Sequence, residues 1–340
     1  TPMGSIAYAL AAGNTVIFKP SEFTPAIGLW LASTLQEVLP NHHLLQVVTG
    51  AGSVGAALIT HGVDKISFTG STATAKKVAA ACVERMIPFV LECGGKDPVL
   101  IDKDADLERA ADHALWSGMS NAGQSCIGAE RIYVHHEVSE RFTAILKERA
   151  SHIKAGVNYG AATRPAQLEI IKRHVSDAIT AGANMLIGDT NSIGDRYVAP
   201  VVMMNVPENC TAMTEETFGP TIAINVVKDM DEAIRLSNAS EYGLGASVFA
   251  KRNGERIAAQ LQCGMVAINS AFSFAAIASV PFGGAKQSGY GRIHGPEGLY
   301  EFTYARTLVT PRFEIPLRAT SFKRTSGQER IISTLSKWFS

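Results

Sequence analysis

The chain has 340 residues, 46% of them hydrophobic and 18% charged, with 31 basic and 31 acidic side chains. This length supports a sizeable core and roughly two domains. A net charge of zero gives no reason to expect nucleic acid as a partner. The five cysteines lack paired spacing, which argues against a disulfide framework and favours a reducing, cytoplasmic setting. The adjacent pairs His42-His43 and His135-His136 have poor geometry for holding one ion, so we predict no metal site.

The first ninety-two residues alternate between strand and helix patterns. Short apolar runs predict strands at 15–19, 44–49, 65–68 and 88–91, and longer periodic runs predict helices at 24–38, 53–60 and 71–84. This alternation is typical of a parallel sheet with helices on both faces, in which ligands bind beyond the carboxyl ends of the strands. Lys19, Gly50, Gly70 and Glu92 all fall at such ends.

A second α/β block follows. Its predicted helices are 106–119, 139–150, 166–181, 231–237 and 255–261, and its predicted strands are 131–135, 197–202, 221–226, 246–249 and 264–269. Residues 286–305 return to glycine-rich connections with a short helix. The β-branched run Thr307–Thr310 predicts a last strand, but it has no local partner.

Two glycine-containing segments could contact a nucleotide. Gly50-x-Gly52-x-x-Gly55 follows a strand and opens a helix, yet the next strand ends without the acid that the dinucleotide fingerprint needs. We therefore expect tight turns or adenine-side contacts there. Phe68–Thr72 joins a strand to a helix N-terminus, which suits either a phosphate site or an ordinary Ser/Thr cap.

Other polar groups have both a functional and a structural interpretation. Glu22, close after Lys19, could accept both ribose hydroxyls of an adenosine and repel a 2′-phosphate, or the two could be a solvated charge pair. Glu215–Pro220 is a turn between two strands. Cysteines outside position 126 are expected to be small buried hydrophobes: Cys82, Cys93, Cys210 and Cys263.

Two residues in glycine-rich runs point to chemistry. Glu92 lies in Leu91–Lys96, and Cys126 lies 34 residues later (126 − 92) in Asn121–Arg131. Motifs along almost the whole chain succeed one another in an order that resembles aldehyde dehydrogenases: Asn14–Glu22, Phe68–Ser71, Glu92–Lys96, Gly123–Cys126, Glu216–Pro220, Asn269 and Pro281–Gly289. Because several independent motifs match in order, the chain resembles that superfamily, and the match implies that it begins part-way through the family's sequence.

The resemblance implies a fold and a division of the chain. The fold would be α/β, with two doubly wound parallel-sheet domains and an oligomerisation strand. Residues 1–92 would form part of the cofactor-binding domain, 93–286 the catalytic domain, 287–305 a return to the cofactor-binding domain, 306–312 the oligomerisation strand and 313–340 a tail. A homodimer or homotetramer is expected, because Thr307–Thr310 matches the strand that joins a neighbouring subunit's sheet.

The resemblance also implies residue roles. Cys126 resembles the family nucleophile and Glu92 its general base. The cofactor contacts would be Lys19 and Glu22 at the adenosine ribose, Gly50 nearby, Gly70 and Ser71 at the pyrophosphate, and Glu216 and Phe218 at the nicotinamide ribose and ring. The implied reaction is oxidation of an aldehyde through a thiohemiacetal and a thioester, which water activated by Glu92 then hydrolyses. NAD is expected rather than NADP because of Glu22.

Alternatives remain open because the chain departs from the family pattern. Family members usually have leucine where Cys93 stands, and an asparagine that forms half of the oxyanion hole precedes the stretch matching Thr1. A non-catalytic fragment is therefore one alternative, and the chain alone is expected to be inactive or weak. A dehydrogenase that passes the acyl group to coenzyme A is the other, but such relatives generally lack Glu92.

Two further expectations concern the substrate and the tail. Residues 269–282 contain Phe272, Phe274, Ile277 and Phe282 and no lysine or arginine, so an apolar aldehyde is expected rather than a carboxylate-bearing semialdehyde. Apolar residues at helical spacing in the tail are accompanied by basic ones: Ile331, Ile332, Leu335, Trp338 and Phe339 with Lys323, Arg324, Arg330 and Lys337. Docking of this helix on its own or a neighbouring subunit is favoured over binding to a membrane surface.

Overall fold

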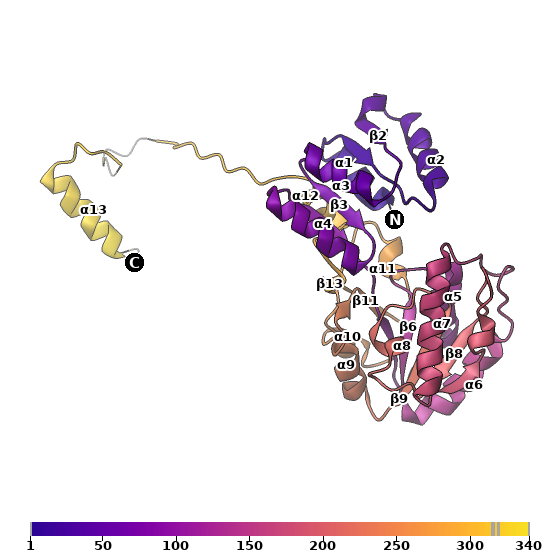
Figure 1. Ribbon diagram of the computed structural model, residues 1–340. Coiled ribbons are helices and arrows are strands. Elements are labelled where there is room, and N and C mark those ends of the chain that lie inside the picture. Colours follow the sequence, from indigo (N-terminus) through magenta and orange to yellow (C-terminus); the bar gives the residue numbers. More distant parts are fainter. Residues whose placement is uncertain (1, 314–316, 318–319, 339–340) are drawn as a thin grey trace. The chain divides into compact units, whose positions relative to one another are not determined.

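A computed structural model describes residues 2–313, 317 and 320–338, and the chain divides into two compact units, Thr1–Thr303 and Tyr304–Ser340 (Figure 1). The first unit contains every sheet. The second contains one helix, α13 (Ser326–Trp338). Phe339, expected to belong to this helix, lies outside the described residues.

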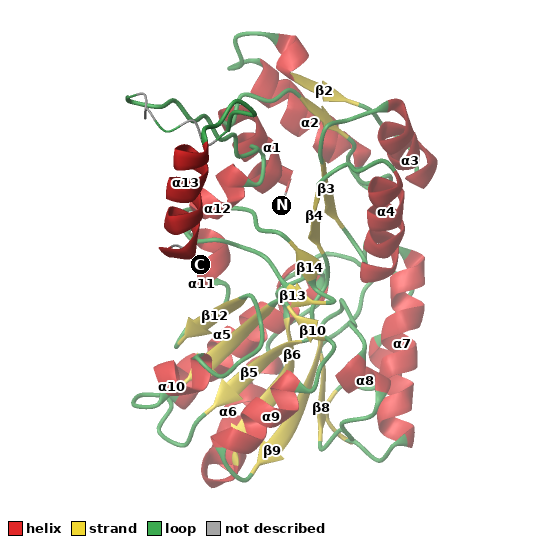
Figure 2. Cartoon of the chain, turned by 90° about the vertical axis from the view of Figure 1, so that its left-hand side faces the viewer, coloured by secondary structure: helices red, strands yellow, loops and turns green. Residues whose placement is uncertain are grey.

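A seven-stranded sheet forms the larger core of the first unit (Figure 2). Its strands, in spatial order, are β12 (Met265–Ile268), β11 (Gly245–Phe249), β5 (Asp97–Ile101), β6 (Ala129–His135), β9 (Thr221–Val227), β8 (Val201–Met204) and β7 (Asn184–Ile187). All neighbours are parallel except β7, which pairs antiparallel with β8 at the edge. The central strands are buried almost throughout and mostly apolar, as expected for a parallel sheet that is covered on both faces.

Helices cover both faces because alternate strand residues point in opposite directions. Val99 and Ile132 belong to a buried cluster with helices α5 (Leu107–Met119) and α6 (Ser139–Ala150). Leu100 and Tyr133, one residue further along, belong to a second cluster on the other face. That cluster is completed by α7 (Pro165–Thr180), α9 (Met230–Asn238) and α10 (Gly254–Ala258). The double cover confirms the expected α/β architecture for this part of the chain.

The N-terminal strands form two small sheets, where one continuous sheet was expected. β1 (Val16–Phe18) pairs in parallel with β2 (Leu45–Val47), and β3 (Ile66–Thr69) pairs in parallel with β4 (Phe89–Glu92). The accompanying helices are α1 (Pro2–Ala11), α2 (Pro25–Gln36), α3 (Gly52–His61) and α4 (Thr72–Glu84). Strands β1 to β4 have only three or four residues each. The lack of pairing between the β1–β2 sheet and the β3–β4 sheet therefore removes few backbone hydrogen bonds.

Short elements join these small sheets to the rest of the unit. β14 (Gly289–Tyr290) adds to β4 antiparallel, and β10 (Tyr242–Gly243) pairs with β13 (Ala285–Lys286). The remaining helices are α8 (Thr211–Thr214), α11 (Ser273–Ala276) and α12 (Gly295–Tyr300). Figure 2 shows β14, β13 and β10 between the β3–β4 pair and the large sheet. Glu92 therefore ends a strand at the junction of the two sheets.

Several sequence expectations need correction. The strand expected at 197–202 begins only at Val201, because Pro200 has no N–H to donate and the carbonyl of Tyr197 instead accepts the N–H of Gly194 in a turn. Strands β5 and β7 and helix α1 were not predicted. The helix expected at 255–261 ends at Ala258.

The strand expected at 306–312 is not formed within the single chain. Thr307–Thr310 has no regular structure, and Leu308 and Val309 are exposed. A lone extended segment has no partner for its backbone N–H and C=O groups, so pairing with a second chain stays a prediction. Among the described residues, no helix combines the length and apolar character that crossing a membrane requires.

Candidate active site

Glu92 is the last residue of β4 and is only 4% exposed. Its backbone is fixed by pairing with Gly289 and by a 3.0 Å hydrogen bond that its carbonyl accepts from the N–H of Gly70. Neither carboxylate oxygen has a hydrogen-bond partner among the described residues. Burial raises the pKa of Glu92 to about 8, against a smaller lowering by Arg292. An unpaired buried carboxyl of this kind is available to take a proton from a bound reactant.

Cys126 lies in the loop between a short 3₁₀ turn (Ser120–Gly123) and β6. The turn is tight: Asn121 and Ala122 have positive φ angles of 54° and 57°. Gly123, at φ 66°, lies so close to the backbone of Gly219 that any Cβ would overlap it. The Cys126 loop is therefore held against the segment that follows Phe218.

The thiol of Cys126 is half-buried in an acidic surrounding. Its pKa is raised to about 12, first by burial and then by the carboxyl groups of Asp97, Glu216 and Glu92. The structure thus brings the two residues singled out in the sequence, Cys126 and Glu92, close enough for their charges to interact. Each of these carboxyl groups, when ionised, disfavours the thiolate of Cys126.

Glu216 lies in the turn after α8. Its carboxylate packs against Gly94, where any side chain would overlap it, and it accepts a hydrogen bond from the N–H of Gly95. Burial and, to a smaller extent, the nearby Glu130 together raise the pKa of Glu216 to about 8. Because Gly94 follows Glu92 by two residues, the two acids flank one short stretch of backbone.

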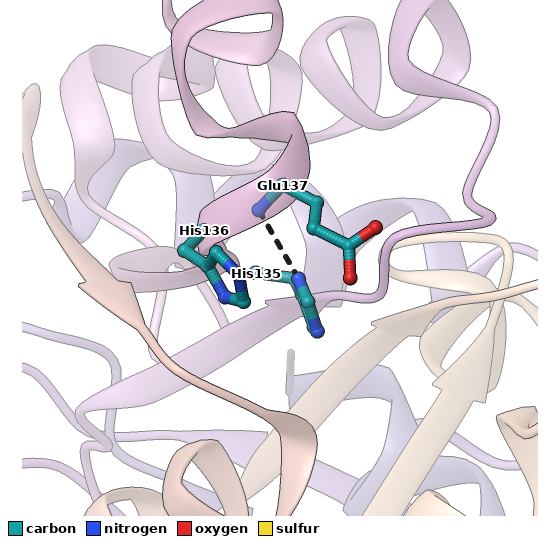
Figure 3. Close-up of side chains that lie close together, drawn as sticks. All are labelled: His135, His136 and Glu137. Carbon is teal, nitrogen blue, oxygen red and sulfur yellow. Dashed lines mark hydrogen bonds between the residues drawn. The ribbon is translucent and has the colours of Figure 1, made fainter.

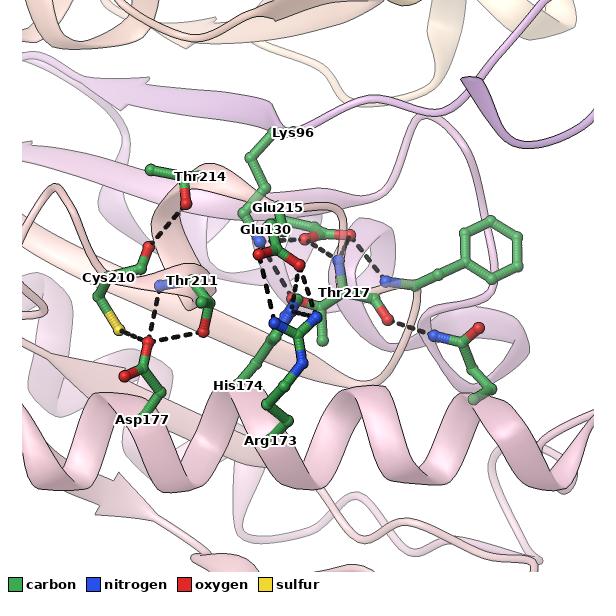
Figure 4. A network of polar contacts seen from close by, with 12 residues as sticks. Lys96, Glu130, Arg173, His174, Asp177, Cys210, Thr211, Thr214, Glu215 and Thr217 are labelled. Carbon is green, nitrogen blue, oxygen red and sulfur yellow. Dashed lines mark hydrogen bonds and ion pairs between the residues drawn. The ribbon is translucent and has the colours of Figure 1, made fainter. Parts of the chain in front are cut away.

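A buried ion pair holds the turn that carries Glu216 and Phe218 (Figure 4). Glu130, near the start of β6, pairs with Lys96 and accepts hydrogen bonds from the N–H groups of Thr217 (2.8 Å) and Phe218 (2.9 Å). Lys96 also donates to the Thr217 hydroxyl at 3.0 Å. The left-handed φ of Phe218, 50°, is thus fixed by one carboxylate that takes two successive N–H groups.

Helix α7 supports the same turn from a second direction (Figure 4). Gln167 donates to the carbonyl of Thr217 at 2.6 Å, and His174 is 3.0 Å from the Thr217 hydroxyl. Asp177 accepts from the N–H and hydroxyl of Thr211 at the start of α8, and these bonds lower the pKa of Asp177 to about 2. The turn is consequently fixed between β6 and α7.

The expected adenosine contacts form a separate group at the ends of β1 and β2. The ammonium of Lys19 donates to the carbonyls of Pro20 (2.8 Å) and Gly50 (2.9 Å), and it lies 3.7 Å from the carboxylate of Glu22. Glu22 is exposed. Lys19, Glu22 and Gly50 therefore meet at the carboxyl ends of two adjacent parallel strands, which is where nucleotides bind in such sheets.

Gly70 and Ser71 lie where β3 meets α4. Any Cβ at Gly70 would approach the ring of Phe68 to 2.6 Å, so packing alone requires glycine there. The Ser71 hydroxyl accepts from the N–H of Thr74 at 3.4 Å, which is an N-cap. The capping hydrogen bond expected for an ordinary Ser/Thr cap is therefore formed, and binding of a phosphate at this helix end stays a prediction.

The expected pocket aromatics divide into two groups. Phe274 is buried, and Phe282 is half-buried, in an apolar cluster that also contains Cys126 and Leu244. Phe272 precedes α11 with a left-handed φ of 65° and is not in this cluster. Two of the three aromatics thus belong to the same apolar cluster as Cys126.

Some residues at the site were missed in the sequence. Asp97 is buried at the start of β5, and its Oδ2 atom has no hydrogen-bond partner among the described residues. Burial raises the pKa of Asp97 well above its usual value. Arg292 donates to the carbonyls of Gly284 and Gly291 and is the cation that acts on Glu92. Asp97 and Glu130 share a signal that was overlooked: each is an acid at the beginning of a strand whose residues are all buried.

His135, His136 and Glu137 lie together at the end of β6, with potential ligand atoms within 4.8 Å of one another (Figure 3). The Nδ1 atom of His135 accepts from the N–H of Glu137 at 3.2 Å, and Nδ1 of His136 faces the carbonyl of Lys228 at 2.9 Å. Glu137 pairs with Lys103 at 3.2 Å. These contacts explain the cluster as a cap of the following turn.

Comparisons with known proteins agree with this geometry. The model of the aldehyde dehydrogenase family matches residues 1–308, and the chain belongs to that family. A putative succinate-semialdehyde dehydrogenase [NADP(+)] 2 of Mycobacterium tuberculosis is 39% identical over 315 residues, covering 89% of this chain and 61% of its own length. A 4,4′-diapolycopene aldehyde oxidase of Methylomonas sp is 39% identical over 331 residues, covering 94% and 62%. The chain thus spans about three fifths of these relatives.

Solved structures show the same fold. A NAD-dependent aldehyde dehydrogenase from Sinorhizobium meliloti has a TM-score of 0.84 at 32% identity, over 88% of this chain and 62% of that one. A betaine aldehyde dehydrogenase from Staphylococcus aureus in complex with NAD+ has a TM-score of 0.82 at 34% identity, with the same coverage of both chains. Within the described residues, the α/β architecture is therefore that of an aldehyde dehydrogenase.

The Glu130 network yields a stability prediction. Glu130→Gln leaves Lys96 buried without its counter-charge, so we expect it to lower the free energy of unfolding by about 3–5 kcal/mol. Glu137→Gln is the matched control, because it removes an exposed pair with Lys103 that is worth at most about 1 kcal/mol. Urea unfolding followed by circular dichroism measures both. Equal effects of the two substitutions would show that the buried pair does not hold the turn.

Proposed function

We propose that this chain carries the catalytic machinery for oxidising an aldehyde to a carboxylic acid with a nicotinamide dinucleotide. The observation that supports this most directly is the meeting of a buried, unpaired carboxyl (Glu92) with a half-buried thiol (Cys126) at the carboxyl end of β4. The family match and the fold are consistent with it. Because the chain spans 61% of its relatives, the activity of the whole protein is part of the proposal.

The chemistry follows from the two side chains. The thiol of Cys126 loses its proton to solvent, and the resulting thiolate adds to the aldehyde carbon and forms a C–S bond, which places negative charge on the aldehyde oxygen. The Cys126 N–H can donate to that oxygen. Loss of hydride from the same carbon restores the C=O bond and leaves a thioester on Cys126. Glu92 takes a proton from water, the water oxygen attacks the thioester, and the C–S bond breaks to release the acid.

A bound nicotinamide dinucleotide supplies the hydride acceptor for this reaction. The residues present fit such a group: Lys19 and Glu22 stand together beyond β1, and Glu216 lies buried beside Gly94. We assign the adenosine ribose to Glu22 and Lys19, with Gly50 nearby, the pyrophosphate to Gly70 and Ser71, and the nicotinamide end to Glu216 and Phe218. The buried turn of Phe218 then orients one wall of the nicotinamide site.

Hydrolysis is favoured over transfer of the acyl group to coenzyme A. Glu92 has no other polar partner among the described residues, so its carboxylate is free to activate water. Acyl transfer to an incoming thiol has no need for this base. The coenzyme A alternative therefore does not explain why a buried carboxyl without a partner lies at position 92.

The assignment of Cys126 and Glu92 can be tested without cofactor by p-nitrophenyl acetate, an activated ester that acylates a reactive thiol. We expect a burst of p-nitrophenol and then slow turnover. Cys126→Ala should abolish the burst, and Glu92→Gln should keep it while slowing turnover by about 10²–10⁴-fold. Cys263→Ala, which removes another half-buried thiol, is the control and should change neither phase. A burst that survives Cys126→Ala contradicts the nucleophile assignment.

The turnover phase should also depend on pH in a defined direction. The pKa of Glu92 is raised to about 8, so its carboxyl is mostly protonated at pH 6 and becomes a base as the pH rises through 8. Steady-state turnover should therefore rise with a midpoint near pH 8, and this rise should be missing in Glu92→Gln. Background hydrolysis of the ester at each pH is subtracted. If the turnover of the Glu92→Gln variant rises with the same midpoint, the titrating group is not Glu92.

We propose NAD rather than NADP as the preferred cofactor, although relatives of both kinds are known by name. The exposed carboxylate of Glu22 would repel a 2′-phosphate, and its partner Lys19 is already engaged with two backbone carbonyls. Titration calorimetry of the chain with each dinucleotide measures the preference. Glu22→Ser should narrow the ratio of the two dissociation constants at least several-fold, whereas a preference for NADP in the unaltered chain overturns the proposal.

The substrate we propose is an apolar aldehyde. Phe274, Phe282 and Leu244 share an apolar cluster with Cys126, and the ionisable groups that act most on the thiol are carboxyls. A carboxylate on the substrate, as in succinate semialdehyde, would be poorly solvated there and repelled by any of these carboxyls that is ionised. Each buried methylene of an alkyl chain instead gains about 0.8 kcal/mol.

Protection of Cys126 against iodoacetamide tests this substrate class. An aldehyde that adds reversibly to the thiol blocks alkylation, so its half-protecting concentration reports binding. We expect hexanal to protect at concentrations at least ten-fold below succinate semialdehyde, and Phe282→Ala to weaken protection by hexanal in particular. Alkylation of Cys126 is followed by mass spectrometry of the peptide, with Cys263 as the internal reference. Better protection by succinate semialdehyde contradicts the proposal.

A further inference from the structure

Residues 304–340, hereafter the basic segment, have a composition unlike the rest of the chain. They contain seven lysines and arginines against two acidic residues, a net charge of +5. Because the whole chain is neutral, residues 1–303 carry −5. The family match ends at residue 308, so almost all of this segment lies outside the part of the chain that the family shares.

The only helix described in the basic segment, α13, is strongly amphipathic. Ile331, Leu335 and Trp338 follow one another at spacings of four and three residues, which places them on one face of α13. Arg330 and Lys337 fall on the opposite face. No residue of α13 is buried, and Trp338 is 85% exposed. The apolar face is therefore uncovered in the described structure.

A second apolar and basic group precedes the helix. Phe322 is fully exposed and is followed directly by Lys323 and Arg324, both exposed as well. The segment thus combines exposed aromatic residues with adjacent positive charge at two points about 16 positions apart along the chain (338 − 322). Aromatic residues of this kind settle at the boundary between water and lipid, and basic side chains pair there with anionic headgroups.

We propose that the basic segment docks on an anionic lipid surface, with the apolar face of α13 buried among the acyl chains. Low overall hydrophobicity, clear separation of the two faces and basic residues on the polar face are the features of a helix that lies in a membrane interface. A helix of 13 residues is marginal in water by itself, so burial of its apolar face must stabilise it.

The charges select lipid over the chain's own body as the occupant. The net charge of residues 1–303 is only −5, whereas an anionic leaflet offers dense negative charge to every basic side chain at once. A lipid surface also accepts the aromatic and aliphatic side chains without a shape-matched groove. The basic segment supplies none of the residues of the proposed chemistry, so this inference does not depend on the proposed function.

Co-sedimentation of the full chain with vesicles tests it. We expect binding to vesicles of phosphatidylcholine with 30% phosphatidylglycerol, weak binding to pure phosphatidylcholine, and a marked loss in 0.5 M NaCl. Replacing Ile331, Leu335 and Trp338 together by serine should abolish binding. Lys323→Gln with Arg324→Gln should weaken it roughly 25-fold, since each basic residue contributes about five-fold.

The matched control changes the same helix on its polar side. Ser333→Ala, Thr334→Ala and Ser336→Ala together should leave vesicle binding unchanged. A blue shift of tryptophan emission on anionic vesicles that disappears in Trp338→Phe would place this face in the lipid. Equal binding to both vesicle types, or binding that survives the triple serine substitution, overturns the proposal. Self-association that is lost in the triple serine variant, without vesicle binding, overturns it in favour of a protein partner.

Discussion

The candidate site depends on one buried carboxylate that belongs to the sheet. Glu130 lies in β6, between β5 and β9, and it accepts two successive N–H groups from the turn that carries Glu216 and Phe218. Lys96 balances its charge in an interior where an unpaired ion is costly. A rigid strand thus dictates the path of a loop. Residues on loops are held as accurately as residues on strands when their backbone is fixed in this way.

Several buried acidic side chains lie near the thiol of Cys126, and their burial is energetically unfavourable. Glu92, Glu216 and Asp97 all lie within the electrostatic reach of Cys126, and burial raises the pKa of each. Such a cluster costs stability, because poorly solvated carboxyls cannot all ionise. Groups with strongly shifted pKa values gather at functional sites because catalysis needs them. The apolar side chains of Phe274 and Leu244 strengthen the effect by excluding water from the same space.

Local patterns predicted much of the fold, and their failures have physical causes. Helix α6 was predicted with its bounds because its apolar spacing is regular, and β1 to β4 were placed within one or two residues. β5 begins with Asp97-Pro98, two residue types that are rare in strands, so its sequence does not predict a strand. β14 has only two residues, and its partner β4 lies nearly two hundred residues earlier in the sequence. Motifs singled out Cys126 and Glu92, whose charges the structure brings within reach of each other. The role of Glu130 depends on its contact with Thr217, 87 residues later, which no local pattern contains.

The high pKa of Cys126 has a consequence for the protein at rest. Peroxides and disulfides react with a thiolate far faster than with a thiol. With its pKa near 12, Cys126 is almost entirely protonated at neutral pH, and it is half-buried as well. Its first oxidation step, to a sulfenic acid, is therefore slow. The acids near the sulfur thus favour the thiol form of Cys126, and this protects the proposed nucleophile from oxidation.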